Sequence, residues 1–106
     1  MSVTVMSLVF YADGLTPSQK LVLLAMADHA NDYGKSIYPA VRRLEIKTGL
    51  SERTVQSTLK ELRDELKLIT ITNPASQHKA NEYEIDLQKL YQMWHPEVRQ
   101  LHPNHH

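Results

Sequence analysis

Residues 41–60, VRRLEIKTGLSERTVQSTLK, constrain the fold of this chain more than any other stretch. Their pattern predicts two short helices joined by a tight turn at residues 49–51. Gly49 can adopt the positive φ of a sharp turn without steric penalty. The hydroxyl of Ser51 can accept a hydrogen bond from the free amides that begin the second helix. The rest of the chain must therefore support a compact pair of helices.

The second helix of this pair has an apolar inner side and a polar outer side. Leu44, Leu50, Val55 and Leu59 are placed to hold the two helices together. The outward side chains can bond base edges and phosphate, and they are Arg53, Thr54, Gln56, Ser57 and Lys60. Arg53 suits guanine and Gln56 suits adenine. The alternative is a solvated helix face, but the turn and the apolar positions favour a helix-turn-helix with its recognition helix second.

A longer helix is predicted ahead of this motif, from Thr16 to about Asn31. Thr16 can cap it, Pro17 fits the first helical position, and Gln19 stands where a capping-box partner belongs. His29, late in this helix, is expected to interact favourably with the negative end of the helix dipole.

Shorter elements are predicted on either side of that helix. Residues 1–14 are expected to form an N-terminal arm or short helix that packs on the core. Residues 36–38 should be extended, because Tyr38 precedes a proline. Pro39 is then expected to open the first helix of the motif, which should end near Thr48.

Two strands are predicted after the recognition helix, which should run to about Leu66. Residues 68–72 are β-branched and alternating, and residues 81–85 alternate again after a polar loop. Paired antiparallel, they make a wing. Asp86 is expected to cap a last short helix, whose apolar residues Leu90, Tyr91 and Trp94 either cover the core or form dimer contacts. The predicted fold is mainly α with a small β-wing: an α+β winged helix-turn-helix.

The charge of the chain is unevenly distributed. The formal net charge is zero, which argues against an indiscriminate binder of polyanions, yet residues 35–63 are locally positive by four. Several polar side chains from this window and the wing are expected to contact DNA phosphates. They are Lys35, Ser36, Arg42, Arg43, Lys47, Ser51, His78, Lys79 and Asn81. For any one of them, plain surface charge is an equally good interpretation.

Several classes of function are disfavoured by the composition. The chain has no cysteine, so disulfides and thiolate zinc sites are excluded. His102, His105 and His106 cluster near the C-terminus without an ordered carboxylate partner, and no metal or other cofactor is expected. No nucleophile–base pair or glycine-rich phosphate loop is present, so an enzyme is not expected. No signal peptide or membrane span is visible, and we expect a cytoplasmic protein of a bacterial host cell.

At 106 residues the chain predicts one domain. We expect an N-terminal arm or short helix at 1–14, a DNA-binding domain at 15–94, and a flexible polar tail at 95–106.

The segments LTPSQKLVLLAMADHAN, IYP, KTGLSERTVQSTLKEL and NEYEI resemble the winged helix-turn-helix domain at the N-terminus of phage and plasmid replication initiators, and that of related small phage regulators. The resemblance covers roughly residues 15–87. It implies sequence-specific binding of double-stranded DNA, with replication initiation at an origin as the setting and a small transcriptional regulator as the alternative. It leaves open whether the chain is part of a longer protein.

Partners follow from the same resemblance. Most such readers bind repeated or palindromic half-sites, which favours a homodimer on DNA. A replication or transcription protein would be a further partner. A different alternative is a winged helix that serves as a protein-interaction module. The zero net charge, and Ser57 at a position that is usually basic, favour that alternative.

Two further departures from the family pattern bear on the geometry. Glu45 stands where a small residue usually packs against the recognition helix, so either its side chain turns outward or the two helices sit slightly apart. Residues 65–67 lack the glycine that usually precedes the wing, and this segment looks one residue longer than in the family pattern.

Overall fold

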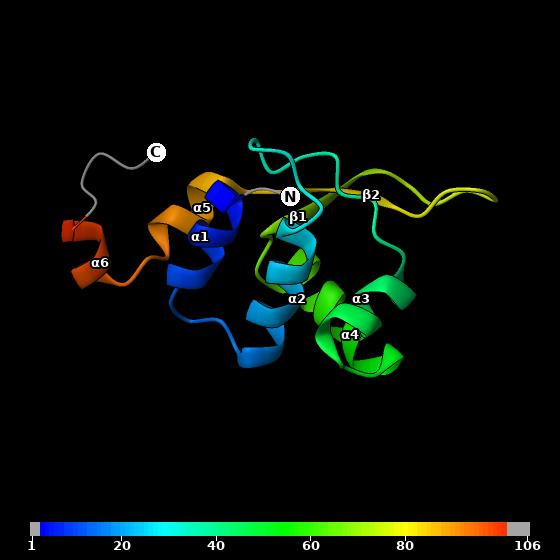
Figure 1. The fold of residues 1–106 in the computed structure, drawn as a ribbon, viewed down its shortest axis with the longest axis horizontal. Coiled ribbons are helices and arrows are strands. Elements are labelled where there is room, and N and C mark those ends of the chain that lie inside the picture. Colours follow the sequence, from blue (N-terminus) through cyan, green and yellow to red (C-terminus); the bar gives the residue numbers. More distant parts are fainter. Residues whose placement is uncertain (1–2, 102–106) are drawn as a thin grey trace.

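Helix α2 (Pro17–Ala27) lies at the centre of the fold, with α1 and α5 on one side and α3 and α4 on the other (Figure 1). The computed structural model describes residues 3–101. Its other elements are α1 (Val3–Tyr11), α3 (Val41–Thr48), α4 (Glu52–Lys60), the π-helical turn η1 (Glu61–Glu65), β1 (Ile69–Asn73), β2 (Glu82–Ile85), α5 (Leu87–Gln92) and α6 (Pro96–Leu101). This arrangement confirms the predicted winged helix-turn-helix fold.

The N-terminus of α2 is closed by the predicted capping box. The Thr16 hydroxyl accepts from Gln19 N at 3.2 Å, and Gln19 Oε1 accepts from Thr16 N at 3.0 Å. The predicted end near Asn31 is wrong, because α2 ends at Ala27. Asn31 Oδ1 accepts from the amides of Tyr33 and Lys35, and this local turn competes with a further helical turn.

The core is formed by α2 together with apolar residues from α1, α3, α4, η1, α5 and both strands. The largest fully buried side chains include Leu8, Leu23, Met26, Ile37, Leu44, Leu62, Leu68 and Leu90. Because these residues come from α1, α2, α3, η1, α5 and the connecting segments, the helix-turn-helix and the wing share one core. That common core fixes the position of the recognition helix relative to the wing.

Helix α1 is held by the C-terminal part of the fold. Trp94 Nε1 donates to the carbonyl of Leu8 at 3.0 Å, and Asp13 N donates to Met93 O at 2.7 Å. Leu90 and Trp94 are buried in the core, and the Tyr91 ring lies 5.2 Å from that of Trp94. These apolar residues were expected either to cover the core or to form dimer contacts. The structure supports the first interpretation, because they pack on the core of their own domain.

Asp86 caps α5 as predicted, and its Oδ1 accepts from Lys89 N at 3.0 Å. Within the region predicted to be a polar tail, Pro96–Leu101 form α6. Proline at the first helical position is preset for a helix, and Val98 packs against the core. His102, His105 and His106 lie outside the described residues, and the division of the chain into arm, domain and tail stays a prediction.

The wing is an antiparallel pair of strands, as predicted. Ile69 pairs with Ile85 and Ile71 with Tyr83, and a bulge lies between Ile71 and Asn73. On the other side of β2, Ile37 forms an isolated bridge with Tyr83. This bridge keeps Ile37 extended, as expected for residues 36–38. The prediction is wrong for Ser36, which adopts φ +61° in the left-handed region.

Helix α3 begins two residues later than predicted. Pro39 does not open it, since Ala40 still has an extended backbone and is the N-cap. The helix ends at Thr48, as expected.

The recognition helix continues into a π turn before the wing. Leu66 N donates to Glu61 O at 2.9 Å, a bond that spans five residues instead of four. Lys67 then adopts φ +54°, and Leu68 N donates to Leu62 O at 2.8 Å. The extra residue noted in the sequence is taken up by η1, and Lys67 occupies the left-handed conformation that glycine would normally supply.

Candidate nucleic-acid interface

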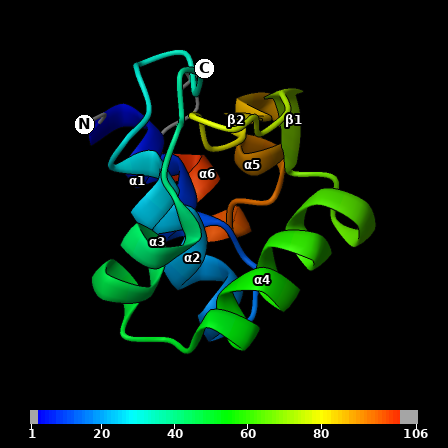
Figure 2. The ribbon, with the colours of Figure 1, turned by 90° about the vertical axis from the view of Figure 1, so that its right-hand side faces the viewer.

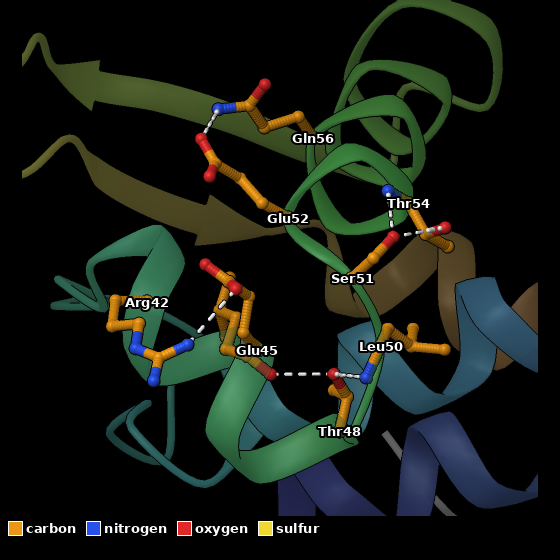
Figure 3. Close-up of polar contacts among 9 residues, drawn as sticks. Arg42, Glu45, Thr48, Leu50, Ser51, Glu52, Thr54 and Gln56 are labelled. Carbon is orange, nitrogen blue, oxygen red and sulfur yellow. Dashed lines mark hydrogen bonds and ion pairs between the residues drawn. The ribbon is translucent and has the colours of Figure 1, made fainter.

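The turn between α3 and α4 has the geometry that the sequence predicted. Gly49 adopts φ +74° and its amide donates to Glu45 O at 2.8 Å. The Thr48 hydroxyl donates to Leu44 O at 2.7 Å and accepts from Leu50 N at 3.2 Å (Figure 3). These local bonds fix the angle at which the chain enters α4.

Helix α4 is capped and packed as expected. Ser51 Oγ accepts from Thr54 N at 3.2 Å and donates to Thr54 Oγ1 at 3.0 Å. The apolar contacts are confirmed, with Leu44, Val55 and Leu59 buried and Leu50 half-buried. The helix is therefore held from behind with its outer face open.

The structure leaves only some of the side chains predicted to read bases exposed and free to contact DNA. Arg53, Gln56, Ser57 and Lys60 are exposed on α4, whereas Thr54 is half-buried and its hydroxyl is bonded to Ser51. The Ser57 hydroxyl donates to Thr54 O at 3.1 Å. Within the described residues, the side chains of Arg53 and Lys60 make no ion pair or hydrogen bond.

Sequence reasoning missed Glu52, which lies on the same face of α4. Gln56 Nε2 donates to Glu52 Oε1 at 3.3 Å. The spacing of four residues between a carboxylate and an amide was the signal that could have found this pair.

The phosphate-contact candidates on and near α3 fall into two groups. Three are engaged in ion pairs: Arg42 with Glu45 at 3.3 Å, Lys35 with Glu84 at 3.7 Å, and Lys47 with Asp28. Arg43 is exposed and lines a cavity of about 280 Å³ with His29, Ser36, Tyr38, Pro39 and Ala40. Much of the local positive charge is therefore neutralised, and Arg43, Arg53 and Lys60 remain unpaired among the described residues 35–63.

The side chain of Glu45 is only 17% exposed and its carboxylate contacts Arg42 (Figure 3). The side chain does not turn outward. The partner cation lowers the cost of covering this carboxylate between α3 and α4.

The wing brings a second set of polar residues to the same end of the molecule. Figure 2 shows α4 in the foreground, with the β1–β2 hairpin above it and directed toward the viewer. His78 and Lys79 are exposed at the hairpin tip. Asn81 instead holds the hairpin, because Oδ1 accepts from Ala75 N and Nδ2 donates to Tyr83 Oη at 3.4 Å.

The groups behind α3 have shifted proton affinities. The hydrogen bond from Lys47 holds the pKa of Asp28 below its usual value, against the opposing effect of burial. Burial lowers the pKa of His29, and Lys47 and Arg43 lower it further, against the effect of Asp28. His29 lies beyond the end of α2 at Ala27, and its lowered pKa disfavours the charged form on which the predicted interaction with the helix dipole depends.

Within residues 3–101 no cluster of three or more histidine, aspartate or glutamate side chains could hold a metal ion. No helix in the part of the chain that the structure describes is long and apolar enough to span a membrane.

A family model described as a helix-turn-helix domain matches residues 13–65, which is half of the chain. This chain belongs to the helix-turn-helix domain family. The match begins just after α1 and runs through η1, so it covers the predicted reading helix and stops before the wing. No curated protein and no solved structure matched the chain. Membership of the helix-turn-helix family supports binding of double-stranded DNA, and members of this family are typically not enzymes.

Proposed function

We propose that this protein binds double-stranded DNA at a specific sequence, with α4 in the major groove and the wing against the adjacent backbone. The exposed row on α4 carries the proposal: Arg53, Gln56 and Lys60 face outward from a helix whose other side is buried. Arginine and glutamine side chains form bidentate contacts with guanine and adenine. Ser57 and Thr54, with bonded hydroxyls, contribute less to base reading.

Phosphate contacts in this proposal come from both sides of the reading helix. Arg43 lies in the first turn of α3 and Ser36 lies in the segment before that helix, while His78 and Lys79 lie at the wing tip. Arg42, Lys35 and Lys47 would add to binding only as their ion pairs open. Ser51 and Asn81 hold the turn and the hairpin, so their contribution is to position other groups.

The test is a titration of labelled DNA fragments from the protein's own genomic neighbourhood at several salt concentrations. A site-specific complex should appear, with log affinity falling linearly with log salt. Arg53→Ala should weaken the cognate site alone, by about 1–3 kcal/mol. Lys79→Ala should weaken all sequences alike and reduce the salt slope by about 0.9.

Lys89→Ala is the matched control, because Lys89 lies on α5, away from α3 and α4 (Figure 1). It removes one positive charge without touching the proposed interface, so its effect should be small. Absence of binding at low salt, together with Arg53→Ala behaving as the wild type, would overturn the proposal.

The biological setting we propose is initiation of replication at a phage or plasmid origin. It rests on the resemblance of residues 15–87 to replication initiators. A transcriptional regulator would use the same reading helix, so the bound fragment must be tested in both roles. Replication of a plasmid that has this fragment as its sole origin, dependent on the protein, supports initiation. Repression of a promoter joined to the fragment, without such replication, supports regulation.

A further inference from the structure

The first turn of α4 holds a carboxylate on the face that we propose enters the major groove. Glu52 is exposed and lies one helical turn before Gln56, whose Nε2 donates to Glu52 Oε1 at 3.3 Å. Figure 3 shows both side chains extended to the same side of α4. The two groups therefore form one polar unit beside Arg53.

This contact fixes the orientation of the Gln56 amide. An ionised carboxylate is an acceptor only, so the NH₂ group of Gln56 must face Glu52 and the carbonyl must face away. One N–H and the carbonyl oxygen of Gln56 remain unused. One donor beside one acceptor is what the N7 and N6 edge of adenine requires. The bond thus prepares Gln56 for this contact before DNA arrives.

Glu52 itself can gain little from the DNA backbone, because a carboxylate is repelled by phosphate. In the major groove its only strong partners are base amino groups, above all N4–H₂ of cytosine. One of its oxygens is bonded to Gln56, and the remaining acceptor positions face outward. A carboxylate in the first helical turn also stabilises the helix through its dipole. That ordinary role predicts no preference for any base.

We propose that Glu52 is a base-reading residue that accepts from the amino group of a cytosine next to the adenine contacted by Gln56. The inference rests on the proposed function and adds a second base position to it. The two side chains act as a pair, since each restricts the rotation of the other. Glu52 also disfavours sites without an amino group at that position, so it increases discrimination more than affinity.

The test compares binding of the full chain to its cognate site and to a panel in which each base pair is replaced in turn. The wild type should prefer cytosine at one position by about tenfold or more. Glu52→Ala should remove this preference, leave the guanine position of Arg53 unchanged and bind non-cognate DNA more tightly. Gln56→Ala should weaken both the adenine and the cytosine preference.

Glu65→Ala is the charge-matched control, because Glu65 is exposed in η1 at the far end of the same helical segment. It should raise affinity for all sites slightly and change no preference. If Glu52→Ala behaves in this way too, the carboxylate reads no base and the inference is overturned while DNA binding stands. If the wild type binds no DNA, the proposed function fails and the inference falls with it.

Discussion

Gln19 Nε2 donates to Glu61 Oε1 at 3.0 Å, across 42 positions of sequence. The same Gln19 side chain closes the capping box of α2 through its Oε1. Glu61 is the first residue of η1, where the recognition helix changes from α to π geometry. One side chain therefore connects the start of the central helix with the end of the reading helix.

Gln19→Ala should lower the free energy of unfolding by about 1–2 kcal/mol, because it removes both a cap and a bond to a carboxylate. Glu61→Ala should cost less, and the double mutant should show a coupling energy in urea denaturation. Gln88→Ala, at an exposed position of α5, is the control and should stay within about 0.5 kcal/mol of wild type. If Gln19→Ala and Gln88→Ala changed the free energy of unfolding equally, the bond between Gln19 and Glu61 would contribute nothing to stability.

Gly34→Ala should destabilise the protein more than Gly49→Ala does. Both glycines have positive φ, but a Cβ on Gly34 would lie 2.8 Å from Leu87 Cδ2 and 3.0 Å from Ile85 O, whereas Gly49 faces open space. Thermal unfolding should therefore show a free energy of unfolding that is lower by about 1–2 kcal/mol for Gly49→Ala and by about 2–4 kcal/mol for Gly34→Ala. The reverse order would mean that the Gly34 loop does not pack against Leu87 as described.

The stability of the protein should fall as the pH is lowered through 6.5. The pKa of His29 is below its usual 6.5 in the folded state, mainly through burial. In this range the unfolded chain binds more protons than the native one, so acidification favours unfolding until the folded pKa is passed. Urea unfolding roughly one pH unit on either side of 6.5 measures this loss. His29→Gln should flatten the dependence. His78→Gln, at the exposed wing tip, should leave it unchanged.

Lys67→Gly should stabilise the protein, against the usual trend for glycine substitutions. Lys67 adopts φ +54° after the π turn, a conformation that is costly for any residue with a Cβ. Relief of this strain, less the added chain entropy of glycine, should raise the free energy of unfolding by about 0.5–1 kcal/mol. Lys60→Gly, inside the regular part of α4, should instead cost about 1 kcal/mol. The denaturant midpoint should therefore rise for Lys67→Gly and fall for Lys60→Gly. A fall for both variants would contradict the strain at Lys67.

Short-range signals in the sequence predicted the fold well. Each expected cap or turn residue forms a bond to a residue three or four positions away, and these residues are Thr16, Gly49, Ser51 and Asp86. The spacing of apolar residues on the two motif helices was sufficient to place their contact. These elements depend on local chemistry, which a single sequence contains.

Features set by distant partners were not predictable in the same way. Nothing near Lys47 in sequence indicates that Asp28 binds its ammonium, and nothing near Pro96 indicates that Val98 reaches the core. Two candidate phosphate contacts, Lys47 and Lys35, are engaged by such distant partners, Asp28 and Glu84. The exposure of Arg53 followed from its helical phase alone. The bond of the Thr54 hydroxyl to Ser51 is local, so it was missed for a different reason: the sequence does not show which of several nearby polar groups a hydroxyl selects.

The π turn at Glu61–Glu65 also bears on how this chain can change length during evolution. It takes up one additional residue between the reading helix and the wing without disturbing the helical phase of the residues before it. An insertion or deletion of one codon at this point would alter where the wing begins, while Arg53 and Gln56 would keep their positions on α4. The junction therefore allows the chain between the base-reading helix and the hairpin to change in length without moving the side chains proposed to read bases.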